Sequence, residues 1–115
     1  MERVYSARDF VRPSDTTPIR SVVLETGDSV IVVWHAKPGQ EIPPHYHPHG
    51  QDTWTVLSGQ ASYYLGGGQQ TPLKVGDIAV ARPGEVHGAF NDGDEEFVFV
   101  SVVSSDKAGY ESSSR

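Results

Sequence analysis

Residues 39–52 read G-Q-E-I-P-P-H-Y-H-P-H-G-Q-D, a short segment that contains most of the histidines of the chain. In an extended strand, the side chains at positions i and i+2 point to the same face. His45 and His47 therefore project together, while Tyr46 points to the opposite face. Because neutral imidazole is the commonest nitrogen ligand for first-row divalent ions, this pair predicts half of a metal site.

Two further residues can complete such a site. Asp52 follows a short loop and precedes a predicted strand, so its carboxylate can lie near the two imidazoles. His87 comes after a turn signal at residues 83–84, which can direct its side chain back across the fold. Gln51 is a competing fourth ligand. His49 is expected at the rim of the site, either as an alternative ligand or as a residue that contacts the ligands without binding the ion.

The rest of the chain is typical of short strands separated by turns. Glycines and prolines recur along it, and no window sustains helical periodicity apart from a single turn near residues 6–10. Strands are predicted at residues 22–24, 29–35, 53–57, 61–65, 77–81 and 97–103, with turns at 26–29, 66–70 and 91–94. Regular short strands of this kind indicate an all-β sandwich or barrel.

Residues 39–59 resemble the first motif of the cupin superfamily. Gly39, His45, His47, Asp52 and Gly59 fall on the positions of that motif, with aspartate where cupins usually have glutamate. The side chain of aspartate is one methylene shorter. The resemblance therefore implies a fourth ligand at Asp52 but leaves Gln51 as the alternative.

Residues 76–91 resemble the second cupin motif. Gly76, Gly84, His87 and Asn91 fall on its positions. Arg82 stands where that motif has its first proline, and Pro83 follows directly. With the flanking predicted strands, the likeness extends over most of the chain.

The resemblance implies a small single-domain cupin, a jelly-roll-like β-barrel with one divalent transition metal ion (Fe, Mn, Ni or Zn). The implied ligands are His45, His47, His87 and Asp52. Trp54 shares a strand face with Asp52 and is expected to point inward. Together with Tyr63 and Arg82, it is a candidate for the wall of a substrate pocket. Trp34 and His35 alternate at the end of a predicted strand, so one of them faces the interior.

The domain organisation follows from the same patterns. We expect an N-terminal arm at residues 1–21, a barrel at residues 22–106 and a flexible tail at residues 107–115. Small single-barrel cupins usually pair, so we expect a homodimer. Residues 4–11 and the strand at 97–103 are the predicted contributors to its interface.

The function implied by the resemblance is that of a metal-dependent enzyme acting on a small polar organic molecule. Dioxygenation is placed ahead of isomerase, lyase or decarboxylase chemistry. The alternative is a non-catalytic cupin that binds or senses a small ligand. Turnover requires an open metal position beside a general base, whereas binding alone requires neither.

Composition excludes several other classes of function. Nine basic residues against fifteen acidic ones give a net charge of −6, which disfavours nucleic acid and anionic membranes as partners. The chain has no cysteine, so disulfides and thiolate ligands are excluded. The first residues lack the pattern of a signal peptide, and a cytoplasmic location is expected.

Overall fold

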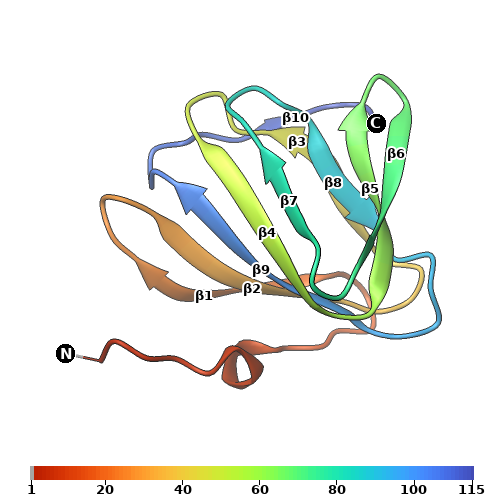
Figure 1. Cartoon of the computed structure of the whole chain (residues 1–115), viewed down its shortest axis with the longest axis horizontal. Helices are drawn as coiled ribbons and strands as arrows, with labels where there is room; N and C mark the ends of the chain where they lie inside the picture. Colours follow the sequence, from red (N-terminus) through yellow and green to blue (C-terminus); the bar gives the residue numbers. More distant parts are fainter. Residues whose placement is uncertain (1) are drawn as a thin grey trace.

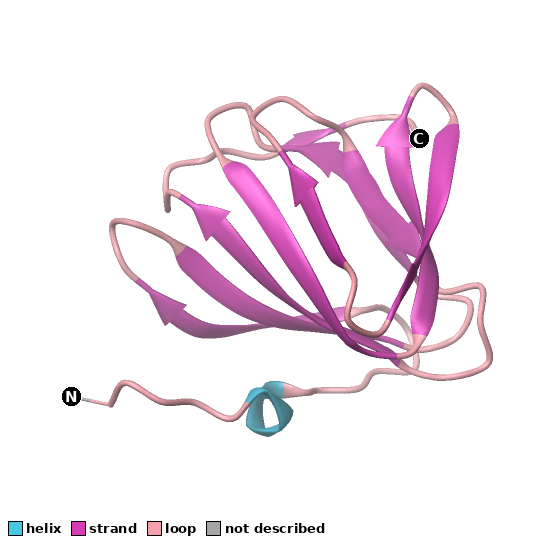
Figure 2. Ribbon diagram, in the orientation of Figure 1, coloured by secondary structure: helices cyan, strands magenta, loops and turns pink. Residues whose placement is uncertain are grey.

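The computed structural model describes residues 2–115, which form two antiparallel β-sheets facing each other (Figures 1 and 2). The first sheet has the strand order β1 (Ile19–Glu25), β2 (Val30–Ala36), β9 (Phe97–Ser104), β4 (Gln51–Ser58) and β7 (Ile78–Ala81). The second has the order β10 (Glu111–Ser112), β3 (Glu41–Tyr46), β8 (His87–Phe90), β5 (Gln60–Gly66) and β6 (Gln69–Lys74). One 3₁₀ helix, η1 (Ala7–Phe10), precedes β1. Within residues 2–115, no helix is long and apolar enough to cross a membrane.

Strand β4 illustrates how the sequence builds the core between the sheets. Asp52, Trp54 and Val56 are buried on one face of the strand, whereas Gln51 and Leu57 are exposed on the other. This period of two is the signature of a half-buried strand. The buried side chains of both sheets meet in one cluster that contains Ala36, Ile42, Trp54, Val56, Ala61, Tyr63, Leu73, Ala79, Ala89, Phe97 and Phe99. The alternation that buries Trp54 also directs Asp52 to the interior.

The all-β prediction is confirmed, but several strand boundaries differ from those predicted. β1 begins at Ile19, inside the predicted N-terminal arm, and Met1 of that arm lies outside the described residues. β6 begins at Gln69, within the predicted turn at 66–70. The short strand β8 has no strong β-propensity of its own. It forms because β3 and β5 pair with it on both sides.

The C-terminal segment, predicted as a flexible tail at residues 107–115, is partly paired with the second sheet. β10 pairs with β3 through Glu111 opposite Tyr46 and Ser112 opposite His45. At the end of the chain, the Arg115 guanidinium donates to the Glu41 carboxylate at 2.5 Å. A two-residue strand carries no pattern of its own, so only the neighbouring strand reveals it.

Strand β9 is a central strand and not an edge. It pairs with β2 on one side and β4 on the other. Residues 97–103, predicted to contribute to a dimer interface, therefore have no free strand edge to offer to a second subunit. The edges of this sheet are β1 and β7.

Replacing Gly59 by alanine is expected to destabilise the fold by about 3 kcal/mol. Gly59 lies between β4 and β5 with φ of 75°, and a Cβ atom there would lie 2.1 Å from the Glu96 carbonyl oxygen. Gly67→Ala is the matched control, because Gly67 has φ of 63° but no atom within 4 Å of its Cβ position. It should cost only about 1 kcal/mol. Urea denaturation measures the free energy of unfolding of both variants. Equal losses of stability would show that the contact with Glu96 does not contribute to the cost.

Candidate metal centre

Both sheets contribute to a cluster of three imidazoles and one carboxylate. His45 lies near the end of β3, His47 follows that strand, and His87 opens β8 directly opposite His45 in the strand pairing. Asp52 comes from β4 of the other sheet. One potential ligand atom from each of the four residues lies within 4.8 Å of the others. Residues far apart in sequence thus meet at one end of the barrel interior.

Backbone carbonyl groups orient all three imidazoles in the same way. In each ring, Nδ1 is hydrogen-bonded to a carbonyl oxygen. Because that oxygen can only accept, Nδ1 carries the proton and is the donor. The acceptors are the Pro43 oxygen for His45 at 2.8 Å, the Gly109 oxygen for His47 at 2.6 Å and the Glu85 oxygen for His87 at 3.1 Å. Nε2 is then the atom of each ring that can coordinate an ion when the ring is neutral. Carbonyl contacts of this kind are how proteins fix the tautomer of a metal-binding histidine.

Asp52 divides its two carboxylate oxygens between the protein and the cluster. The Ser101 hydroxyl donates to Oδ1 at 2.5 Å. Oδ2 lies 2.9 Å from His87 Nε2 and 3.4 Å from His47 Nε2. Because Asp52 is only 4% exposed, its charge lies in a low-dielectric environment. Ser101 holds the carboxylate so that Oδ2 faces the three imidazoles.

Burial and mutual contacts shift the pKa values of the cluster. Burial, followed by the electrostatic interaction with the His87 imidazole, lowers the pKa of His45 to about 4. Burial also acts to lower the pKa of His47, but contacts with Asp52 and the Gly109 carbonyl raise it overall. Burial acts to raise the pKa of Asp52, yet its hydrogen bonds to His47 and His87 hold it well below the usual range. His45 is therefore neutral and Asp52 ionised at neutral pH.

This donor set fits a divalent transition ion. Three nitrogen lone pairs and one carboxylate oxygen converge without a thiolate, a combination suited to iron, manganese, nickel or zinc. A structural zinc site more often uses cysteine. The negative charge of Asp52 would offset part of the charge of the ion.

The two competing ligands lie elsewhere. Gln51 is exposed and, as the neighbour of Asp52 in β4, points to the outer face of the sheet. His49 is exposed in the loop between β3 and β4, where its backbone N–H donates to the Ala108 carbonyl. Neither belongs to the cluster. The structure therefore places the carboxylate, and not the amide, beside the imidazoles.

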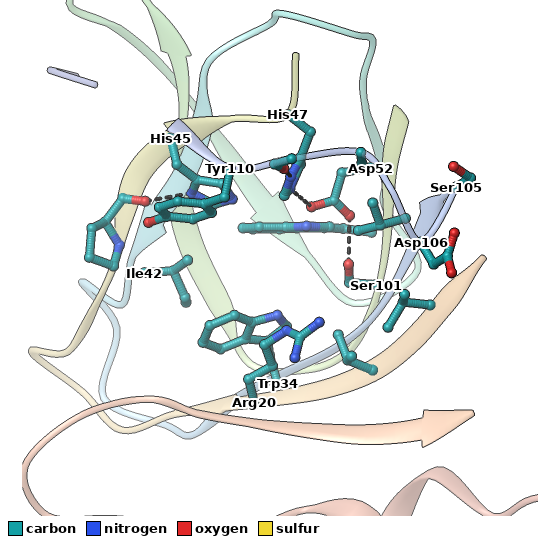
Figure 3. A pocket seen from close by; sticks show the side chains of 17 residues that line it. Arg20, Trp34, Ile42, His45, His47, Asp52, Ser101, Ser105, Asp106 and Tyr110 are labelled. Atoms are coloured by element: carbon teal, nitrogen blue, oxygen red, sulfur yellow. Dashed lines mark hydrogen bonds and ion pairs between the residues drawn. The ribbon is translucent and has the colours of Figure 1, made fainter. Parts of the chain in front are cut away.

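A cavity of about 350 Å³ opens onto the cluster (Figure 3). His45, His47 and Asp52 form part of its wall, and most of the remaining wall is apolar. Its other lining residues are Arg20, Val30, Val32, Trp34, Ile42, Pro43, Trp54, Ser101, Val103, Ser105, Asp106, Ala108, Gly109 and Tyr110. A bound ion would therefore face a space large enough for a small organic molecule.

Of the three predicted pocket residues, only Trp54 lines this cavity. Tyr63 is buried in the core, where its ring packs edge-on against Trp54 at 5.2 Å. Arg82 is exposed, and its guanidinium lies 3.7 Å from the Glu85 carboxylate. Trp34 proves to be the inward member of its pair. His35 points to the opposite face, with Nε2 3.2 Å from the Glu96 carboxylate.

Four residues of the site were not identified from the sequence. Ser101 is one small polar residue within the apolar run of β9, and that break in the run is the signal that could have revealed it. Tyr110 stacks on the His45 ring with centroids 4.8 Å apart, and Gly109 binds His47. Arg20 reaches the cavity from β1. The last three come from segments taken as a tail and an arm.

Comparisons with known proteins agree with this geometry. A protein from Klebsiella pneumoniae, described as conserved with a double-stranded β-helix domain, is 61% identical over 100% of both chains, with a TM-score of 0.97. An RmlC-like cupin protein from Desulfovibrio desulfuricans is 25% identical over 90% of this chain and 97% of its own, with a TM-score of 0.80.

Germin-like protein 5-1 of rice, Oryza sativa subsp. japonica, is 34% identical over 80 residues. The match covers 63% of this chain but only 34% of the rice protein. Residues 32–103 match the family model described as the cupin domain. That match includes all four residues of the cluster. With its two antiparallel sheets and its double-stranded β-helix relative, the chain belongs to the cupin superfamily.

Proposed function

We propose that this protein is a metal-dependent enzyme that acts on a small polar organic molecule, and that its reaction is a dioxygenation. One observation carries the proposal. Potential ligand atoms of three imidazoles and Asp52 lie within 4.8 Å of one another, and His45, His47 and Asp52 line a cavity of about 350 Å³. A divalent ion held there would supply Lewis-acid or redox chemistry at positions open to the cavity.

The residues of the chain orient the metal-binding side chains and shield the cavity from water. Carbonyl oxygens fix the three imidazoles, and Ser101 fixes the Asp52 carboxylate. Trp34, Trp54 and Ile42 give the cavity apolar walls that exclude water from around the reacting groups. The site is therefore preorganised before a substrate enters.

The surroundings of the cluster favour dioxygenation over isomerase, lyase or decarboxylase chemistry. A non-redox reaction of an enediol or hydroxyketone needs a protein base placed beside the metal-bound substrate. Apart from the four-residue cluster, the carboxylate that lines the cavity is Asp106, which is exposed. A reaction driven by dioxygen places less demand on such a base.

Metal analysis together with oxygen uptake tests the proposal. Protein purified without added metal is analysed for its elements, then assayed in an oxygen electrode with catechols, enediols and β-diketones. We expect close to one metal ion per chain and metal-dependent uptake with one of these classes. His87→Ala is the control and should abolish both.

Two results would decide against the proposal. Protein that neither retains nor binds a metal ion would remove its basis. A metal-loaded protein that binds these compounds without consuming oxygen or converting them would favour the second candidate, a non-catalytic cupin that binds or senses a small ligand.

We also propose that the protein forms a homodimer through the outer face of the first sheet and its β7 edge. Ile78 and Val80 of β7 are 65% and 41% exposed on that face, an arrangement that favours burial against a second copy.

Ile78→Lys is expected to convert dimer to monomer in light scattering. Leu65→Lys, at a residue 50% exposed on β5 of the other sheet, should not. A wild-type protein with the mass of a single chain at micromolar concentration would refute the dimer.

A further inference from the structure

Arg20 is the arginine that lines the same cavity as the metal ligands. It lies on β1 opposite Trp34 of β2, so both side chains share the inner face of the sheet. In Figure 3 the two side chains lie together at the end of the cavity away from the histidines. A positive charge therefore stands across the cavity from the candidate metal centre.

The guanidinium of Arg20 is available to a ligand. Among residues 2–115, the lysines and arginines that form ion pairs are Lys37, Lys74, Arg82 and Arg115, whose partners are Asp15, Asp77, Glu85 and Glu41. No carboxylate in this part of the chain lies within ion-pair distance of Arg20. An arginine that projects into a mostly apolar cavity without a carboxylate partner is a suitable anchor for an anionic group.

The walls between Arg20 and the metal centre define the rest of the ligand. Trp34, Val32 and Ile42 line the same cavity with apolar side chains, and Trp34 presents an aromatic surface. A molecule that spans the cavity would place a flat or apolar body against these residues. Its two ends would meet a cation and a metal ion.

We propose that this cavity binds a small organic carboxylate at two points, with the carboxylate on Arg20 and a metal-binding group at the His45, His47, His87 and Asp52 cluster. Only the contact at the metal centre rests on the proposed function, whereas the contact with Arg20 does not. A single guanidinium, with Asp106 on the same cavity wall, suits a monoanion better than a phosphate dianion. The substrate class is therefore a carboxylic acid that carries an oxygen-donor chelating group.

A pair of probes that differ in one carboxylate tests this inference. Benzohydroxamic acid carries a metal-binding hydroxamate on a flat ring, and its meta- and para-carboxy derivatives add the anion. Binding to the Ni²⁺-loaded protein is measured by isothermal titration. We expect one of the carboxy derivatives to bind about tenfold more tightly than the parent compound.

Three variants assign that advantage to Arg20. In Arg20→Gln the ratio between the carboxy probe and the parent should fall close to unity, while Arg20→Lys should keep part of it as a point charge. Asp106→Asn is the control for the net charge of the cavity mouth, and it should maintain or increase the ratio. The advantage should also shrink as salt concentration rises.

The outcomes separate this inference from the proposed function. If benzohydroxamic acid binds but neither carboxy derivative binds more tightly, the role of Arg20 is refuted while the metal centre stands. The role is also refuted if Arg20→Gln leaves the ratio unchanged. If Ni²⁺ itself does not bind, the proposed function fails. The carboxy probes are then titrated against the metal-free protein, and no difference between wild type and Arg20→Gln would refute the role of Arg20 as well.

Discussion

Asp52→Asn is expected to weaken metal binding by well over about 100-fold. This loss is larger than that usually caused by substituting a residue that only hydrogen-bonds to a ligand. The substitution removes the protein charge that would offset a divalent ion in a buried site. It also converts the carboxylate whose Oδ2 faces His47 and His87 into a neutral amide of lower affinity for the ion. His45→Ala, His47→Ala and His87→Ala should each be at least as damaging.

Two neighbouring substitutions are the controls for this prediction. Gln51→Ala should have almost no effect, because Gln51 is exposed on the outer face of β4. Ser101→Ala should weaken binding by about tenfold, since it removes the hydroxyl that orients the Asp52 carboxylate but leaves both oxygens in place.

Competition with a chromogenic chelator measures all of these affinities in one buffer. Thermal melts of the metal-free variants show whether each one folds. Loss of binding in Gln51→Ala, with Asp52→Asn unaffected, would contradict the ligand assignment. The site would then be three histidines and an amide, which holds a more positive ion and favours isomerase or lyase chemistry over oxygen chemistry.

Metal binding is expected to raise the melting temperature by about 10 °C at a free metal concentration about 100 times the Kd. Because the ligands lie on or directly after β3 and on β4 and β8, an ion there joins the two sheets. Excess Mn²⁺, Fe²⁺, Ni²⁺ or Zn²⁺ is added to the metal-free protein, and the melt is followed by circular dichroism. A melting temperature that ignores all four ions would argue against any metal site.

The gain should shrink by more than half between about pH 7.5 and about pH 5.5. A ligand imidazole must be neutral to coordinate, and the pKa of His47 is raised from 6.5, so protons compete for it already near neutral pH. The pKa of His45, about 4, keeps that ring neutral throughout this range. A gain independent of pH would contradict the role of His47 as a ligand.

The metal-free protein should also lose stability in acid, and the direction follows from the same groups. The folded pKa of His45 lies below its ordinary value of 6.5, so the unfolded chain binds the proton first. Its contribution therefore falls as the pH drops from 6.5 to about 4. The lowered pKa of Asp52 stabilises the fold above 3.8 and is lost as pH falls through the folded value. His47 acts in the opposite sense, because its raised pKa stabilises the fold below 6.5.

The sequence by itself determined the fold class and the core of the candidate metal site. Both follow from patterns among residues that are close together in the sequence. The alternation of buried and exposed residues in β4 predicts a strand, and the same period places His45 and His47 on one side. The resemblance to the two cupin motifs implied that Asp52 and His87 would join them, and the structure brings the four residues together.

Only the tertiary structure decided what surrounds that site. Arg20, Ser101 and Tyr110 are brought to the cavity by strand pairing and by the path of the chain, and none of them belongs to a local motif. The tail is ordered as β10 because β3 offers it an unpaired edge, not because two residues have any strand preference of their own. Likewise, β9 looks like any other apolar strand in sequence, and its central position follows from which neighbours pair with it. Side-chain period is a local property of the chain, whereas the neighbours of a strand depend on how distant segments meet.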